Sequence, residues 1–280
     1  MSVEAGLIDP LDALHSERDP HVLRVGLVVP QSGALGITGP SAVDAALLAA
    51  HEINAAGVLG ARSLGLVLID AGRPPGDVAT EVDLLCGAGA VDVLVGFHTS
   101  DVHRAIEAAV SGRTPYIFTP PHEGGPRLPG VVCTGVDPAH QLRDAVGPLT
   151  ARHRLRRWAL IGNDYIWPHA MHRAAERLIA DTPGRIVFER LVAFGTVRAT
   201  IEPLLDGLRA HRPDGLLLSL IGRDLVDFNR ALRRAGLDRR LVRLSGALEE
   251  NGLLAAGGDD TGGMYASMQS FATLADDRRL

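Results

Sequence analysis

Residues 158–179 read WALIGNDYIWPHAMHRAAERLI and contain one complete pattern of strand, turn and helix. The run WALIG is apolar throughout, as expected of a parallel strand that is covered on both faces. After Pro168, apolar residues recur with the spacing i, i+3, i+4, i+7 and i+8, which places them on one side of a helix. Asp164 and Pro168 are helix-start signals. The stretch therefore predicts a strand followed directly by an amphipathic helix, the repeating unit of an α/β protein.

The same alternation extends over most of the chain. Helical stripes separate further strand-like runs, which lie at residues 23–29, 64–70, 91–96, 115–118, 185–192, 214–220 and 241–245. Repetition of strand, helix and strand predicts open, doubly wound parallel sheets.

The series of elements divides into two lobes, in agreement with the size of the chain, 280 residues. A segment rich in proline and glycine, residues 120–140, lacks helical periodicity and is expected to cross between the lobes. The predicted organisation is a polar tail at 1–21, an N-terminal lobe at 22–135, a C-terminal lobe at 136–265, and a segment at 266–280 that recrosses to the N-terminal lobe.

The composition limits the partners and the compartment. A formal net charge of −5 and a pI of about 6.1 argue against a direct nucleic-acid partner. Only two cysteines, Cys86 and Cys133, are present, which is neither a disulfide framework nor a metal-binding pattern. No stretch is long and apolar enough to cross a bilayer, and residues 1–21 lack the features of a secretory leader. We therefore expect no membrane insertion and a cytoplasmic location, with a periplasmic location as the alternative if a leader has been removed.

Polar and aromatic residues gather in the loops that follow the predicted strands. Ligands of open α/β sheets bind at these carboxyl ends, where helix N-termini also present oriented N–H groups. Hydroxyl groups at Thr99, Ser100 and Thr119 suit a small ligand with a carbonyl or carboxylate group. Tyr165 and Trp167 are conspicuous because aromatic residues make up only 4% of the chain. We predict that both rings contact a ligand.

Signatures of enzymes are weak. The glycines of residues 33–39 follow the spacing GxxGxxG rather than the GxGxxG of dinucleotide-binding loops, and the chain has neither a P-loop nor a GxSxG nucleophile motif. We expect no cofactor. The alternative that remains open is an α/β hydrolase-like enzyme, with or without a metal, that uses His98, Asp101, His122 and Glu123.

Several of these motifs, taken in order, resemble a known family. They are VGLVVPQSGALGITG (25–39), LVGFHTSDVHRA (94–105), TPPHEG (119–124) and IGNDYIWP (161–168). The chain is similar to the leucine/isoleucine/valine-binding family of type I periplasmic-binding-protein folds, over about residues 23–270. Within that family it most resembles the branch of amide sensors and of short-chain amide and urea binding proteins.

The resemblance implies a two-lobed clamp that binds a short-chain amide, urea or an amino acid in a cleft between the lobes without catalysing a reaction. The partner would be a transporter permease or a regulatory protein. Carried over position by position, the ligand-binding residues would be His98, Thr99, Ser100, Phe118, Thr119, Pro120, Pro121, Tyr165, Trp167, Ala247 and Glu249, with Glu250 as the alternative acid.

The sequence departs from this family in two respects. Amide sensors usually have tyrosine at the positions that match His98 and Phe118. Family members also continue for several more elements beyond the position of Leu280, so we expect a chain that lacks the usual C-terminal elements. An uncovered sheet edge in the first lobe would then favour a homodimer.

Overall fold

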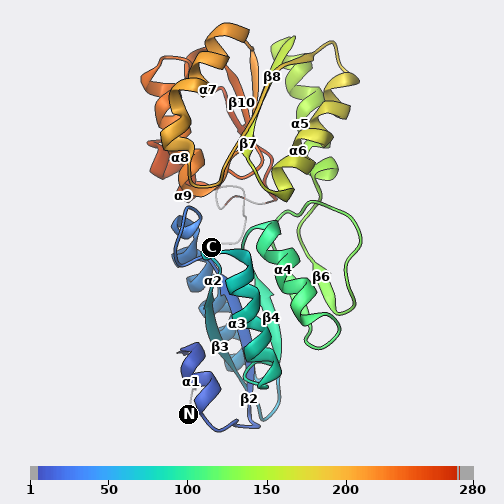
Figure 1. Cartoon of the computed structure of the whole chain (residues 1–280), viewed down its shortest axis with the longest axis vertical. Coiled ribbons are helices and arrows are strands. Elements are labelled where there is room, and N and C mark those ends of the chain that lie inside the picture. Colours follow the sequence, from blue (N-terminus) through green and yellow to red (C-terminus); the bar gives the residue numbers. More distant parts are fainter. Residues whose placement is uncertain (1–5, 270, 272–280) are drawn as a thin grey trace. The chain divides into compact units, whose positions relative to one another are not determined.

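A computed structural model describes residues 6–269 and 271 of the chain. These residues separate into two compact units. The first unit comprises the described residues up to Pro120 together with Gly125–Gly135, and the second comprises Pro121–Gly124 together with the described residues from Val136 onward. Each unit is an α/β domain built around its own parallel sheet (Figure 1). The predicted fold class, two doubly wound parallel-sheet lobes, is confirmed.

The first unit contains a parallel sheet in the order β1-β3-β2-β4-β5-β6. Its strands are β1 (Leu7–Ile8), β2 (Val22–Val29), β3 (Ser63–Asp70), β4 (Val93–Gly96), β5 (Tyr116–Phe118) and β6 (Val131–Cys133). Its helices are α1 (Pro10–His15), α2 (Gly39–Ala56), α3 (Pro75–Gly87) and α4 (Ser100–Val110), with a 3-10 turn η1 (Gly36–Thr38). Because the chain places β3 on one side of β2 and then β4 on the other, the strand order reverses between β2 and β4. That reversal marks the edge where ligands of such sheets bind.

Two apolar layers hold this sheet. One face packs against α1, α3 and α4 through residues such as Ala13, Val78 and Ile106. The opposite face packs against α2 through Val43 and Ala50. Both cysteines are free and half-buried.

The segment predicted as a polar tail contains β1 and α1. Strand β1 pairs with β3, and the guanidinium of Arg24 donates to the Ala13 carbonyl at 3.0 Å and to the Ser16 hydroxyl at 3.1 Å. Asp9 caps α1 by accepting a hydrogen bond from the Leu11 amide at 2.8 Å. Apolar residues of this segment, among them Ile8, Ala13 and Leu14, pack against the core of the first unit, so the segment is not a polar tail.

The second unit contains a parallel sheet in the order β11-β10-β9-β7-β8. Its strands are β7 (Arg157–Asn163), β8 (Arg185–Val192), β9 (Gly215–Ser219), β10 (Val242–Ser245) and β11 (Met264–Ala266). Its helices are α5 (Pro138–His153), α6 (Ile166–Ala180), α7 (Val197–His211), α8 (Gly222–Arg234) and α9 (Glu250–Ala256), with a 3-10 turn η2 (Asp238–Arg240). Helices α5 and α6 cover one face, and α7 and α8 cover the other (Figure 1). Here the strand order reverses between β7 and β9.

The strand MYA belongs to this second sheet. Residues 264–266 pair in parallel with β10 and form its edge. Met264 and Tyr265 lie within the range predicted for the C-terminal lobe, and Ala266, the first residue of the segment predicted to recross, also belongs to the second sheet. Residues 270 and 272–280 of the predicted recrossing segment lie outside the described residues. Among the helices that the structure describes, none is long and apolar enough to cross a membrane.

Candidate ligand-binding site

The loop after β2 is fixed by a carboxylate of the neighbouring strand. Asp70, the last residue of β3, accepts hydrogen bonds from the amides of Gln31 at 2.7 Å and Gly72 at 2.8 Å, and from the Ser32 hydroxyl at 2.7 Å. Burial alone would raise the pKa of Asp70, but these hydrogen bonds hold it below its usual value. The backbone approaches so closely that a Cβ at Gly72 would lie 2.1 Å from the Ser32 carbonyl oxygen. The carboxylate thus shapes the loop.

His98 follows β4 and lies in the core of the first unit. Its side chain is only 4% exposed, and its Nδ1 donates to the Thr99 carbonyl at 3.1 Å. Its Nε2 accepts a hydrogen bond from the Tyr116 hydroxyl at 3.0 Å, and the ring centroids of His98 and Phe118 are 5.2 Å apart. Burial lowers the pKa of His98 to about 3, so the imidazole is neutral. Its two nitrogens are already hydrogen-bonded inside the protein.

The first turn of α4 holds polar atoms that lack partners. Ser100 is 2% exposed, and its Oγ has no hydrogen-bond partner among the described residues. The same holds for Oδ1 of Asp101, the next residue. Buried polar atoms are nearly always hydrogen-bonded, so two such atoms on one turn are unusual. The preceding residue, Thr99, does not cap the helix with its side chain, so the first amides of α4 also point out of the helix without a capping partner from that residue.

The other candidates of the first unit lie on β5 and in the loop that follows it. Phe118 is fully buried, and it stacks on His103 with ring centroids 4.1 Å apart. The Thr119 hydroxyl donates to the Gly96 carbonyl at 3.0 Å. Pro120 and Pro121 are half-buried, and the boundary between the two units falls between them. Phe118 and Thr119 therefore connect β5 to Gly96 of β4, while Ser100 and Asp101 each have a buried side-chain oxygen without a hydrogen-bond partner among the described residues.

In the second unit, three aromatic rings form a cluster at the carboxyl edge of the sheet. The rings of Tyr165 and Trp167 stack with centroids 6.4 Å apart, and Tyr165 lies 6.1 Å from Phe194. Trp167 is only 3% exposed, Tyr165 is half-buried and Phe194 is 37% exposed. Sequence reasoning missed Phe194, whose only signal was an aromatic residue just after a strand. Accessible ring surface at this edge comes from Tyr165 and Phe194, with Trp167 packed behind them.

Two buried polar side chains hold the loops that carry these rings. Asn163, the last residue of β7, donates from Nδ2 to the Asp224 carboxylate at 2.6 Å and accepts from the Ile221 amide at 3.0 Å. Asp224 also accepts from the amides of Gly195 at 2.7 Å and Val197 at 3.2 Å. Burial raises the pKa of Asp224, against the effect of these hydrogen bonds. The loops after β7, β8 and β9 are tied together at this point.

Ala247 and Glu249 follow β10 in the second unit. The Ala247 amide donates to the Ser245 hydroxyl at 3.3 Å. Glu249 is half-buried, and burial together with the neighbouring Glu250 raises the pKa of its carboxyl group. Glu249 precedes α9, a helix of only 7 residues.

A serine, a histidine and a glutamate in the second unit are connected in the order of a catalytic triad. The Ser219 hydroxyl is 2.9 Å from His172 Nε2, and His172 Nδ1 is 2.8 Å from a carboxylate oxygen of Glu189. Ser219 is 0% exposed, and its hydroxyl is already engaged within the unit, by His172 Nε2 and by the Ile161 carbonyl oxygen at 3.5 Å. Burial lowers the pKa of His172. The three residues attach α6 to β8 and β9.

The hydrolase alternative is not supported. Its residues divide between the units, with His98 and Asp101 in the first and His122 and Glu123 in the second. His122 accepts a hydrogen bond from the Gly124 amide at 3.0 Å through Nδ1. Within the described ranges, no group of three His, Cys, Asp or Glu side chains is arranged to hold a metal ion.

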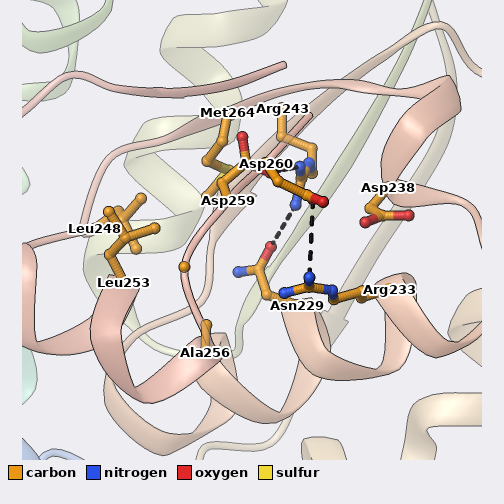
Figure 2. Close-up of a pocket in the computed structure, with 11 residues that line it drawn as sticks. Asn229, Arg233, Asp238, Arg243, Leu248, Leu253, Ala256, Asp259, Asp260 and Met264 are labelled. Atoms are coloured by element: carbon orange, nitrogen blue, oxygen red, sulfur yellow. Dashed lines mark hydrogen bonds and ion pairs between the residues drawn. The ribbon is translucent and has the colours of Figure 1, made fainter. Parts of the chain in front are cut away.

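A small pocket surrounds Arg243 near the amino end of β10, away from the carboxyl edge (Figure 2). The guanidinium donates to Asp259 at 2.6 Å, to Thr261 at 3.0 Å and to Asn229 at 3.2 Å. Burial would raise the pKa of Asp259, but hydrogen bonds from Thr261 and Arg243 keep it low. Both terminal nitrogens of the Arg243 guanidinium are bonded to neighbouring side chains, and only its Nε is buried without a partner among the described residues, so we assign the pocket to the framework of the unit.

Comparison with known proteins places the chain in a family. The family described as periplasmic binding protein matches residues 22–279. The chain belongs to this family. The expectation of a cytoplasmic protein is wrong, because it rested on features of the first 21 residues, whereas members of this family are extracytoplasmic binding proteins.

Solved structures with the same fold are distant in sequence. A solute-binding protein of an ABC transporter from R. palustris in complex with benzoate shares 20% identity at a TM-score of 0.70, covering 80% of this chain and 62% of that chain. A leucine-binding protein from Thermotoga maritima shares 16% identity at a TM-score of 0.68, covering 84% and 67%. An amino acid ABC transporter substrate-binding protein from Pseudomonas fluorescens shares 18% identity at a TM-score of 0.69, covering 80% and 61%. The chain thus spans less than two thirds of the length of the first of these structures.

Proposed function

We propose that the chain is a solute-binding component of an ABC-type transporter and that it binds a small organic solute without chemical change. The solute carries a carbonyl or carboxylate oxygen beside an N–H donor, as an amino acid or a short-chain amide does. The observation that carries this proposal is the first turn of α4, where the Ser100 hydroxyl and one carboxylate oxygen of Asp101 are buried and lack partners among the described residues.

The chemistry of this turn favours such a solute over a simple anion. The Ser100 hydroxyl and the first amides of α4 donate hydrogen bonds, and the helix N-terminus carries partial positive charge, so they suit an oxygen atom. The Asp101 carboxylate only accepts hydrogen bonds, so it suits an ammonium or amide N–H group. An anion without an N–H group would be repelled by the negative charge of Asp101, because it has no donor to offset that charge.

The second unit supplies apolar contact in this proposal. Tyr165 and Phe194 offer ring surface at the carboxyl edge of its sheet, and Glu249 is a second acid near that edge. A solute that binds the carboxyl edges of both units favours the arrangement in which both contacts are made, which couples binding to a change between the units. We prefer transport to the regulatory role of amide sensors, because similar structures carry the names of ABC transporter components.

Calorimetric titration tests the proposal with leucine, phenylalanine, acetamide, urea and benzoate. We expect saturable binding of at least one solute that has both an oxygen acceptor and an N–H donor. Ser100→Ala and Asp101→Asn should each weaken that binding about tenfold, the effect of one hydrogen bond to a buried or charged group. Ser111→Ala at the other end of α4 is the matched control and should leave the affinity unchanged.

Two results contradict the proposal. Binding that is equally strong in the wild type and in both variants of the first turn would place the site elsewhere. Binding of benzoate alone, strengthened by Asp101→Asn, would assign the site to simple carboxylates instead of solutes with an N–H donor.

A further inference from the structure

A single buried carboxylate joins three loops at the carboxyl edge of the second sheet. Asp224 is 2% exposed and accepts hydrogen bonds from the side chain of Asn163 and from the amides of Gly195 and Val197. Asn163 is 0% exposed and in turn accepts the Ile221 amide. Asp224 lies in the first turn of α8 and Val197 begins α7, so the network ties the N-termini of these two helices to the loops after β7, β8 and β9.

Two of the three loops carry the accessible rings. Phe194 directly precedes Gly195, whose φ of +81° permits the sharp turn before α7. Tyr165 lies two residues after Asn163, and the Asp164 amide between them donates to the Val192 carbonyl at 2.7 Å. The two rings meet with centroids 6.1 Å apart and planes inclined by 58°. The relative position of the rings therefore depends on the hydrogen bonds beneath them.

We infer that Asp224 is a positioning residue that fixes Phe194 against Tyr165, and that the resulting pair of rings selects solutes with an aromatic group. This inference rests on the proposed function and adds to it the class of side group that the solute carries. Phe194 is 37% exposed at an edge where ligands of such sheets bind. Aromatic groups prefer stacked or edge-to-face contacts with one another. A tilted pair of rings with one face open can make such a contact with an aromatic ring of the solute.

The physical reason for a carboxylate at position 224 is its number of acceptor sites. An ionised carboxylate accepts several hydrogen bonds and donates none, which matches three N–H donors. Asparagine has the same shape but turns one acceptor into a donor, so Asp224→Asn places an N–H group either against the Val197 amide or, with the amide flipped, against the N–H groups of Asn163 and Gly195. The loop of residues 193–197 then loses its fixed course, while the packing of α8 is retained.

The matched control is Asp214→Asn in the same sheet. Asp214 also accepts backbone amides, those of Arg156 and Arg157 at 2.9–3.1 Å, but at the opposite, amino-terminal edge. Hydrogen exchange followed by mass spectrometry should show faster exchange of residues 193–197 in Asp224→Asn and no change there in Asp214→Asn. Equal exchange of this loop in both variants and the wild type would overturn the positioning role.

The relative affinity for phenylalanine and leucine is a measurement that a purely structural role of Asp224 would not change. We expect Asp224→Asn to weaken phenylalanine about tenfold more than leucine, and Asp214→Asn to affect both equally or not at all. Phe194→Leu should show the same preference for leucine. In the double variant, Asp224→Asn should add little to the effect of Phe194→Leu, because both changes remove the same ring contact. If the decreases in phenylalanine affinity caused by Asp224→Asn and Phe194→Leu multiply in the double variant, the link between Asp224 and Phe194 is overturned.

The outcomes also separate this inference from the proposed function. If wild-type protein binds neither phenylalanine nor leucine but binds another solute of the panel, the proposed function stands and the aromatic selectivity is overturned. If it binds none, both fall, and exchange of residues 193–197 still decides whether Asp224 holds the loop.

Discussion

The stability of the first unit should depend on pH through His98. The imidazole is buried and its pKa is lowered from 6.5 to about 3, chiefly by burial, which outweighs the opposing hydrogen bond to the Thr99 carbonyl, while the neighbouring His103 lowers it slightly further. An unfolded chain binds a proton near pH 6.5, whereas the folded chain does not until about pH 3. A group with a depressed folded pKa contributes stability that is present above its unfolded pKa and is lost as the pH falls.

The magnitude follows from the distance between the two pKa values. Each pH unit below 6.5 costs about 1.4 kcal/mol of unfolding free energy until the folded pKa is reached. Lowering the pH from 7 to 5 should therefore remove about 2 kcal/mol through His98 alone. Because the side chain is only 4% exposed, solvent screening does not reduce this figure substantially.

Urea denaturation at a series of pH values between 5 and 7.5 measures this effect. The His98→Gln variant should be less stable at pH 7 but should lose about 2 kcal/mol less between pH 7 and pH 5 than the wild type. His51→Gln, which removes an exposed imidazole from α2, is the control for the loss of a histidine as such. Parallel pH profiles of the wild type and His98→Gln would refute the assignment of His98 as a buried, neutral core residue.

Three further substitutions test the architecture of the first unit. Gly96→Ala should destabilise the unit by about 1–3 kcal/mol in urea denaturation, because its Cβ would lie 2.5 Å from Nε2 of His98. An unchanged denaturation midpoint would contradict the close packing of His98 against position 96. Ser100→Ala should leave stability unchanged or raise it by up to about 1 kcal/mol while solute affinity falls, since it removes a buried hydroxyl that lacks a partner; a marked loss of stability would show that the hydroxyl is bonded within the fold. Asp70→Asn should lower the free energy of unfolding by about 2 kcal/mol at pH 7 and by less below pH 4. The reason is that the pKa of Asp70 is lowered in the folded chain, so its stabilisation is lost as the pH falls. An equal decrease of the unfolding free energy at pH 3 and pH 7 would disprove this.

Much of the fold follows from the sequence because parallel strands covered on both faces leave a strong local signal. Runs such as residues 64–70, 185–192 and 241–245 are strands in the structure with bounds that differ by at most one residue. The strand β1 and helix α1 were not predicted, since they are ordered by Arg24 and by pairing with β3. Their order comes from tertiary contacts rather than from any periodicity.

The candidate site was predictable only in part. The sequence predicts Ser100 and Tyr165 as ligand contacts from their position between a strand and a helix start, and both contacts stay predictions. Whether a side chain in such a loop faces a ligand or the core depends on its neighbours. His98 is directed inward by the Tyr116 hydroxyl, and Phe194 is held at the edge by a carboxylate 30 positions further along the chain.

Hydrogen exchange on addition of a solute tests the central claim most directly. With a saturating solute from the titration panel, residues 97–102 of the first unit should become protected together with residues 163–167 and 193–197 of the second. Both regions should be protected by the same solute and lose this protection in Ser100→Ala. Protection confined to other segments, such as the pocket around Arg243, or protection of the first two regions that persists in Ser100→Ala, would contradict the account.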